Sequence, residues 1–466
     1  MRPAQAAADS ELLKKLNQPL SRVTEDAKSA QRIFTAYLDM TKPPKEVGAD
    51  FNMTTIWPGM DGWADVAKWA EANSAMGKVL VDVQNCLVLG VPYGTDGVDA
   101  KFVERGLVAK VGVSSLESKG DFPYLKAVAE INAYVAADMY RLCEAGNYDD
   151  AFKVGLAHLR VLRQACDASM FDEKVAAMVM LCDAFSVHRD VLYTYMQKMG
   201  VERLKRLATK EYPFIKASDN ERLKRLEMPE GDRLVAEALI ASVFVAGQPD
   251  EENFAATFAE LQALEAPLTG FGASKRWQGI ASKHGSLEAS NKKLTAIYDD
   301  WWRRWRMRAY DPIQALPTEL SRTNPVKYAA VVLSARDIAQ MFELRRRLIV
   351  ESCGTVIGCG LAAYRSQFGE WPNDIEKAYA IYVPKRFDFD PYDKDYGRMR
   401  YEYLEAREKG TDSEEVGRVT MTGCLMYARN GDNEFNGASK HIAGGMTGDF
   451  IVWPPLRALS RGQGGE

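Results

Sequence analysis

The sequence predicts a mostly α-helical protein: a body of several helices, packed as helical hairpins or stacked as in an α-solenoid, followed by a small C-terminal α+β module. Apolar residues recur at the three- and four-residue spacing of a helix face along most of the chain. Segments rich in β-type residues gather only in roughly the last hundred residues. Because 466 residues exceed what one hydrophobic core usually organises, we expect more than one unit.

The first unit is expected to span residues 1–120 and to combine helices with an irregular arm. Leucines at helical spacing predict a helix over residues 10–40, and a second helix begins near Trp63 after a proline-rich interruption. The segment 90–97 is dense in turn residues. Residues 101–115 alternate enough to predict either a short strand or an irregular arm.

The second unit, residues 121–325, is expected to be the helical body. Its first part, residues 123–201, contains a turn at 144–152 that is similar to the hinge of tetratricopeptide-like helical hairpins, where glycine reverses the chain. Because no ~34-residue repeat accompanies this turn, a plain helical hairpin is the better interpretation. Further helices are expected over residues 233–246, from about residue 251, and over residues 286–310.

The third unit, residues 326–466, is expected to begin with a long helix and to end in the α+β module. The helix opens at Asn324-Pro325 and ends at Gly369, because glycine accepts the left-handed C-cap conformation and a proline follows shortly. We expect a weak point in it at three glycines, Gly354, Gly358 and Gly360. Three turn-bearing segments then lie beside β-type residues, at Asp390-Pro-Tyr392, Tyr427–Asp432 and Gly448–Pro455.

The order of these features resembles the C-terminal globular part of the major pseudopilins of type II secretion systems. In that family a long helix runs into a Tyr…Gly-x-Tyr-Pro corner, and here Tyr364 precedes Gly-Glu-Trp-Pro372. An Asp-Pro turn, here at Asp390, precedes a small antiparallel sheet, and a calcium-holding loop closes the domain. The resemblance implies that Asp432 and Asp449 hold calcium through their oxygens and that the protein is exported.

The loop departs from the pseudopilin pattern in three places. Ala428 stands in place of a serine, and Asn430 and Asn433 stand in place of glycines, so the turn can survive but one side-chain ligand is lost. In the alternative interpretation, Asp432 and Asp449 only cap turns by accepting hydrogen bonds from backbone amides. The helix lies deep in the chain and is charged, which argues against a filament subunit of the usual kind. A helical body with this ending also resembles large exported bacterial proteins.

One short tryptophan-rich segment is the strongest candidate for chemistry. Trp301, Trp302 and Trp305 can bind a sugar in a cleft, because aromatic faces stack on pyranose rings, with Asp299 and Asp300 as the catalytic carboxylates. In the competing interpretation, the tryptophans anchor this helix in the body, and each aspartate pairs with the arginine four residues later.

Charge, cysteine and histidine content narrow the possible functions. Lys and Arg number 60 and Asp and Glu number 64, and the resulting net charge of −4 argues against a nucleic-acid-binding protein. Seven cysteines without a Cys-x-x-Cys pair and only four histidines argue against a structural zinc site. His158 and His188 lie on amphipathic helices and can face each other across the hairpin. The sequence carries none of the glycine-rich fingerprints that bind nucleotides.

The chain is expected to have no transmembrane segment, because it contains no run of eighteen apolar residues. Its first ten residues lack the apolar centre of a signal peptide but resemble the cleavage end of one. We therefore expect an exported protein, in the periplasm or on the cell surface, whose leader has been removed. A cytoplasmic protein is the alternative.

Three hypotheses of function follow. The first is a non-catalytic exported scaffold or assembly protein, whose helical surfaces and C-terminal cap bind a protein partner or a second copy of the chain. The second is a glycan-acting hydrolase that uses Asp299 and Asp300. The third is a helical ligand-binding protein, which a pocket with convergent polar groups would reveal.

Overall fold

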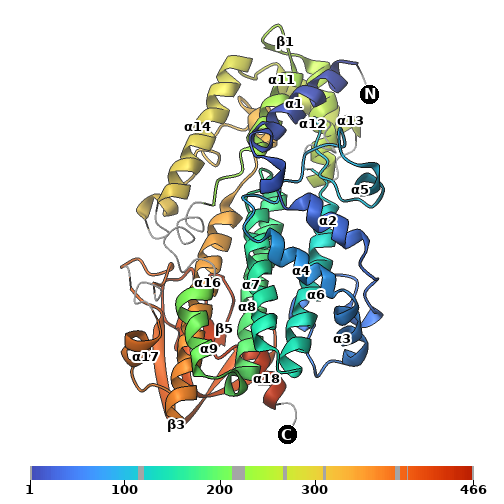
Figure 1. Ribbon diagram of the computed structural model, residues 1–466. Coiled ribbons are helices and arrows are strands. Elements are labelled where there is room, and N and C mark those ends of the chain that lie inside the picture. The colour runs from blue at the N-terminus through green and yellow to red at the C-terminus, as the bar shows by residue number, and fades with distance from the viewer. Residues whose placement is uncertain are drawn as a thin grey trace.

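The structure is a computed structural model that describes residues 3–113, 120–212, 226–265, 270–307, 311–383, 389–395 and 397–463, except for the side chains of 3–8, 259–265 and 270–274. Helices make up most of it, and one four-stranded sheet lies near the C-terminus (Figure 1). This confirms the prediction of a mostly helical fold with a small C-terminal sheet.

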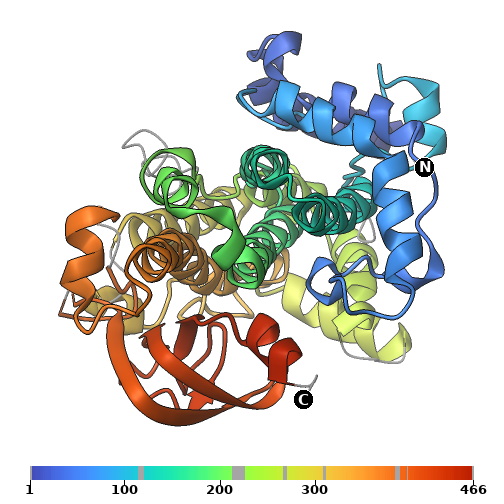
Figure 2. The ribbon, with the colours of Figure 1, turned by 60° about the horizontal axis from the view of Figure 1, so that its bottom comes forward.

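The part of the molecule that carries this sheet has three layers. The N-terminal helices lie on one side of the central helices, and the sheet lies on the other (Figure 2). The central layer consists of α6 (Tyr124–Glu144), α7 (Tyr148–Ala165), α8 (Phe171–Met199), α9 (Val201–Arg206) and α16 (Ala339–Phe368). The N-terminal layer consists of α2 (Ala30–Leu38), α3 (Trp63–Ala72), α4 (Ser74–Val83) and α5 (Ala100–Glu104), whereas α1 (Pro3–Ser21) lies at the end of the molecule away from the sheet (Figure 1).

The segment 101–115 forms an irregular arm. Its first residues, up to Glu104, belong to α5. Asp99 caps the start of this helix, because its carboxylate accepts a hydrogen bond of 3.0 Å from the Lys101 amide. Ala109 and Lys110 then form one isolated bridge each. Within its described part, up to residue 113, the arm contains no regular strand, so the strand alternative is wrong.

The turn between α6 and α7 confirms the predicted helical hairpin. Gly146 has a φ of 79°, and its amide donates to the carbonyl of Cys143 at 3.0 Å. The Asn147 amide donates to Leu142 at 2.8 Å. A glycine with positive φ together with these two backbone hydrogen bonds forms a Schellman motif, the common glycine-terminated end of a helix. The motif lets the chain reverse its direction within a few residues.

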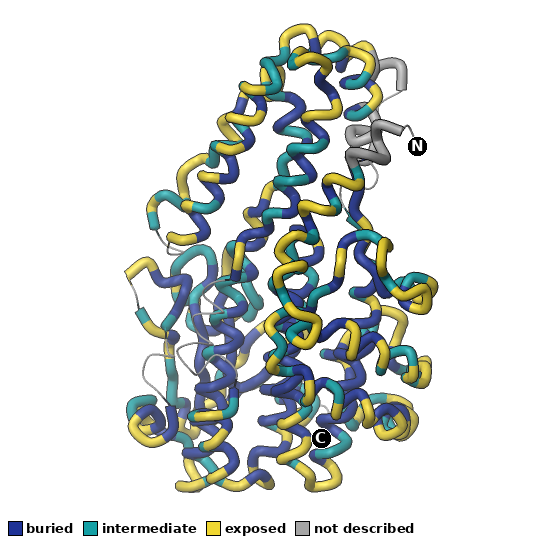
Figure 3. Tube along the Cα trace, turned by 45° about the horizontal axis from the view of Figure 1, so that its top comes forward, coloured by how far each residue is buried: buried dark blue, intermediate teal, exposed yellow. Residues whose placement is uncertain are grey.

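A second group of helices extends the molecule away from the sheet. It consists of α11 (Gly231–Ser242), α12 (Glu251–Glu265), α13 (Gly270–Ala281), α14 (Leu287–Arg306) and α15 (Ala329–Ser334), with a two-residue hairpin formed by β1 (Phe244–Val245) and β2 (Gln248–Pro249). Of these, α11, α12 and α14 agree with the expected ranges to within a few residues. The helix expected from Asn324-Pro325 to Phe368 is interrupted between α15 and α16, so the expectation of one continuous helix there is wrong. Burial is densest along the central helices, and the outer helices alternate between buried and exposed residues (Figure 3).

Asp232, at the start of α11, makes stability depend on pH. It is 3% exposed, accepts a hydrogen bond of 2.6 Å from the Phe171 amide, and lies 3.6 Å from the Arg336 guanidinium. Burial raises its pKa to about 7. The folded state therefore holds a proton that the unfolded state has lost, so this carboxyl contributes stability at about pH 4 that disappears as the pH rises through about 7.

We expect Asp232→Asn to be more stable than the natural protein at pH 8 by about 1–2 kcal/mol, because the amide cannot ionise. The difference should shrink as the pH falls towards 5. Urea denaturation of both proteins at the two pH values measures it. A variant that is less stable than the natural protein at pH 8 would contradict this expectation.

The sheet has the order β5-β3-β4-β6, with β3 (Arg400–Ser413), β4 (Gly417–Ala428), β5 (Lys440–His441) and β6 (Phe450–Trp453). The β3–β4 and β4–β6 pairs are antiparallel, but β5 runs parallel to β3. The sheet is therefore mixed, and the expectation of an antiparallel sheet is wrong for this edge. Two short helices, α17 (Ile375–Ile381) and α18 (Leu456–Gln463), flank it.

The long helix α16 is continuous, so the expected weak point at its glycines is wrong. These glycines instead let other parts of the chain approach the helix. A Cβ atom on Gly354 would lie 2.7 Å from Val452, and one on Gly358 would lie 2.7 Å from Trp453, both in β6. The helix ends at Gly369, which has a φ of 75° as expected for a left-handed cap.

One main hydrophobic core joins the three expected units. It runs from Leu12 in α1, through the central helices, to Trp453 in β6. A second, small cluster lies on the other face of the sheet and includes Leu425 and Ile451. One continuous core therefore crosses the expected boundaries near residues 120 and 325. The three expected units do not have independent cores.

Among the described residues, one helical stretch, Ala329–Phe368, is long and apolar enough to cross a membrane by length and composition. Most of it is buried inside the protein, since 83% of its apolar window is enclosed. We interpret it as a core helix, in agreement with the expectation of no transmembrane segment.

Candidate functional site

The tryptophan-rich segment lies on α14 and packs that helix against its neighbours. Trp301 and Trp305 are 2% and 3% exposed, and their rings lie 6.0 Å and 5.4 Å from Phe342 on α16. The Trp305 indole donates to the Leu226 carbonyl at 2.5 Å. Trp302 is half-buried and donates to the Glu230 carboxylate. The faces of Trp301 and Trp305 are thus covered by protein and do not line an open cleft.

The two neighbouring aspartates have different surroundings. Asp299 is exposed, whereas Asp300 is buried and accepts a hydrogen bond of 3.0 Å from Arg304. Asp300 also accepts from the Glu319 amide at 2.9 Å, and Arg304 donates to the Ile313 carbonyl at 2.6 Å. This pair fastens the segment that follows α14 to the helix, which supports the packing interpretation of Asp300.

Asp432 and Asp449 both accept hydrogen bonds from backbone amides. Asp449 is fully buried, and its two oxygens accept from Asn436 at 3.1 Å and from Ala438 at 2.6 Å. Asp432 accepts from the amide of Glu434 at 3.1 Å. These are the bonds that aspartates make when they cap turns.

Asn430 fills the centre of the same loop. Its side-chain nitrogen lies 3.1 Å from the Ile442 carbonyl, 3.2 Å from that of Gly448 and 3.4 Å from that of Thr447. Carbonyl oxygens of this kind would be needed by a calcium ion, and here the amide already engages them. Among the described residues, no group of three or more His, Cys, Asp or Glu side chains is arranged to hold a metal ion. In this arrangement the Asn430 amide occupies carbonyl oxygens that a calcium ion would use, and calcium stays a prediction from the resemblance.

The buried histidines and the cysteines have structural surroundings. His158 makes a hydrogen bond of 2.7 Å to Asn132, and His188 one of 3.2 Å to Tyr212. Burial lowers the pKa of each histidine to about 3, so both are neutral. All seven cysteines are free thiols.

The site that the sequence did not reveal is a polar cavity of about 190 Å³, which we call the chamber. It lies where α8, α16, the sheet, α18 and the loop around Thr54 meet. Eight ionisable side chains line it: Asp183, Arg189, Asp190, Arg347, Glu351, Glu415, His441 and Arg457. Its remaining wall includes Ser186, Asn52, Thr54 and apolar residues of β6.

Two arginines join α8 to α16 at the back of the chamber. Arg189 and Glu351, whose side chains are 3% and 2% exposed, form an ion pair, and Arg189 also donates to Thr355 at 2.9 Å. Arg347 donates to Asp183 at 2.9 Å and lies 3.7 Å from Glu351. Burying such charges costs a large desolvation free energy. The attraction between the close charges, together with their hydrogen bonds, offsets this cost.

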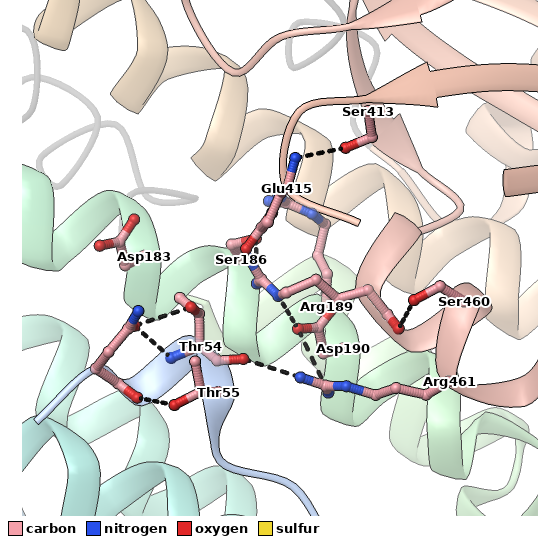
Figure 4. A network of polar contacts seen from close by, with 12 residues as sticks. Thr54, Thr55, Asp183, Ser186, Arg189, Asp190, Ser413, Glu415, Ser460 and Arg461 are labelled. Atoms are coloured by element: carbon pink, nitrogen blue, oxygen red, sulfur yellow. Dashed lines mark hydrogen bonds and ion pairs between the residues drawn. The ribbon is translucent and has the colours of Figure 1, made fainter. Parts of the chain in front are cut away.

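Two arginines of α18 close the front of the chamber, and Figure 4 shows one of them, Arg461, beside Thr54 and Asp190. Arg457 donates to Asp190 at 2.8 Å, to Ser186 at 2.7 Å and to Glu415 at 2.7 Å. Arg461 donates to the Thr54 carbonyl at 2.9 Å and lies 4.0 Å from Asp190. The C-terminal helix is therefore tied to α8, to the β3–β4 turn and to the N-terminal layer.

His441 contributes a neutral ring to the chamber. Its Nδ1 accepts a hydrogen bond of 3.0 Å from the Ile451 amide, so a neutral His441 carries its proton on Nε2. Burial, together with the nearby arginines 189, 457 and 347, lowers its pKa to about 3. His441 therefore offers one N–H donor and no charge near neutral pH.

One sequence signal could have pointed to the chamber. Asp183, Ser186 and Asp190 recur at a spacing of three and four residues, so they form a polar stripe on a helix that is otherwise largely buried. A polar stripe on a core helix predicts buried polar partners. It does not predict which segments supply them.

Comparison with known proteins adds no relative to this picture. No family model matches the chain, and no curated protein and no solved structure matches it either.

Proposed function

We propose that this protein is a non-catalytic binding protein that holds a small polar ligand in the chamber. The observation that carries the proposal is the chamber's wall, where ionisable side chains surround an open volume of about 190 Å³. Apolar residues of similar size would usually stabilise a core as well as buried ion pairs do. A concentration of buried charges around a cavity is instead typical of a functional site.

The ligand-binding proposal is tested by filling the chamber. Ser186→Leu places an apolar side chain in its wall, and Ser282→Leu, on an exposed position after α13, is the matched control. Small molecules released by denaturing the purified proteins are identified by mass spectrometry. We expect a compound that is released from the natural protein and the control and is absent from Ser186→Leu. Equal release from all three proteins would contradict the proposal.

The second candidate is the exported scaffold, which two exposed apolar residues favour. Phe368 and Ile381 are 47% and 43% exposed, at the ends of α16 and α17. A hydrogen bond between Tyr382 and Gln367 brings these two helix ends together. Exposed apolar residues at two neighbouring helix ends favour a protein contact.

Native mass spectrometry of the protein from its own cell tests the scaffold candidate. It reports protein partners, subunit number and bound calcium together. If this surface is a contact, Phe368→Ser with Ile381→Ser should release the partner or second copy, whereas Leu87→Ser, 53% exposed elsewhere, should not. Export and the pseudopilin-like character of the module remain predictions from the sequence.

A further inference from the structure

We propose that the ligand of the chamber carries an ammonium group and is a small amine. This inference rests on the proposed function, because it names the chemistry of the ligand in the same site.

Four lining carboxylates each have one oxygen that accepts no hydrogen bond from the described part of the chain, and one of these oxygens, Glu351 Oε1, lies 3.7 Å from Arg347 Nε. Asp183, Asp190 and Glu415 each use one oxygen to accept from an arginine, which leaves Oδ2, Oδ1 and Oε2 open. None of these three is among the buried atoms that protein encloses on all sides. Asp190 is the strongest of the three, because its side chain is only 2% exposed and one oxygen is still open.

The donors around the chamber are mostly engaged. Each nitrogen of the Arg457 guanidinium makes one hydrogen bond, and Arg189 Nε is enclosed by protein. Arg347 donates to Asp183, and its Nε, 3.7 Å from Glu351, is enclosed by protein without a hydrogen bond. His441 adds one N–H. The open atoms are therefore chiefly carboxylate oxygens, which an ammonium group with three donors can satisfy.

The charges at the chamber bear on the same ligand. Four carboxylates and three arginines line it, Arg461 lies at its front, 4.0 Å from Asp190, and His441 is neutral. Although burial lowers it, the carboxylates of Asp190 and Glu415 raise the pKa of Arg457 above its usual range. The carboxylates thus stabilise positive charge at this place. A small cationic ligand would also be attracted by these carboxylates. This electrostatic attraction is stronger inside the protein than in water.

Volume limits the size of the amine. The chamber, at about 190 Å³, is smaller than the ~300–1,000 Å³ of pockets that hold drug-sized ligands. A chain of about four carbons with a polar group at each end is a suitable probe of such a volume.

Four compounds of this length separate the possibilities in isothermal titration calorimetry on the full chain: putrescine, γ-aminobutyrate, 1,4-butanediol and succinate. We expect putrescine and γ-aminobutyrate, which carry ammonium, to bind at least about tenfold more tightly than the diol and the dicarboxylate. Asp183→Asn and Glu415→Gln should each weaken the amines by about tenfold, because each removes the charge but keeps the shape. Glu414→Gln, an acid that pairs with Lys440 beside the chamber, should leave binding unchanged.

The outcomes also separate this inference from the proposed function. If succinate or the diol binds as tightly as the amines, the ammonium inference is overturned and the chamber remains a ligand site. If none of the four binds, the ammonium inference is overturned as well. The proposed function fails only if Ser186→Leu still releases the same compound as the natural protein. Glu415→Gln is the safer variant, because its side chain is 47% exposed and its loss of charge spares the fold.

Discussion

Replacing Arg189 by methionine is expected to lower the free energy of unfolding by about 3–5 kcal/mol, because it leaves a buried carboxylate without its partner. Arg189 and Glu351 are both almost completely buried, and they join α8 to α16 at the back of the chamber. Arg189 also donates to the Glu351 carbonyl at 3.0 Å and to Thr355 at 2.9 Å, so one substitution removes several bonds. Urea denaturation followed by tryptophan fluorescence measures the loss.

A second substitution shows whether the loss comes from the unpaired charge. Arg189→Met combined with Glu351→Leu removes both charges, and we expect it to recover at least half of the stability lost by Arg189→Met alone, which is about 2 kcal/mol. Arg206→Met is the matched control, since Arg206 is 47% exposed and pairs with Asp149 at the surface; its effect should stay below about 1 kcal/mol. Strictly additive effects of the two buried substitutions would show that the pair is not coupled.

The local elements of this fold could be predicted because short-range signals determine them. The reversal at Gly146 and the end of α16 at Gly369 both depend on a glycine with positive φ at a helix terminus, which the sequence shows directly. The helices of the body follow from apolar spacing. The parallel pairing of β5 with β3 could not be predicted, because it joins Lys440 to Asp412 across a long connection with no turn motif of its own.

The chamber could be predicted only in part, since its walls come from distant segments. Asp190 and Arg457, which meet at 2.8 Å, are 267 residues apart in the sequence. The sequence shows a polar stripe on α8 and three consecutive arginines at 345–347, but it gives no sign that the stripe and one of these arginines, Arg347, line one cavity. The tryptophan-rich segment shows the opposite case. Its residues are adjacent in sequence and predict a site, yet Trp301 and Trp305 pack into the core.

The glycines of α16 show how tertiary packing reverses a local expectation, and they lead to the second large effect. By helix propensity, Gly358→Ala should stabilise the helix by up to about 1 kcal/mol. In this fold a Cβ at position 358 would lie 2.7 Å from Trp453 Cε3. Trp453 is 1% exposed and is held on other sides by Tyr193 and Trp371, so it cannot move away easily. We therefore expect Gly358→Ala to lower the free energy of unfolding by roughly 2–3 kcal/mol.

The same substitution at another glycine supplies the control for this argument. Gly279 lies on α13, and a Cβ there would meet no atom within 4 Å. Gly279→Ala should therefore raise the free energy of unfolding by about 0.5–1 kcal/mol, as expected for an exposed helix position. Urea denaturation of the two variants and the natural protein shows whether each substitution raises or lowers the free energy of unfolding. If both substitutions stabilise the protein, β6 does not pack against α16 as closely as described, and the sheet face of the chamber must be placed differently.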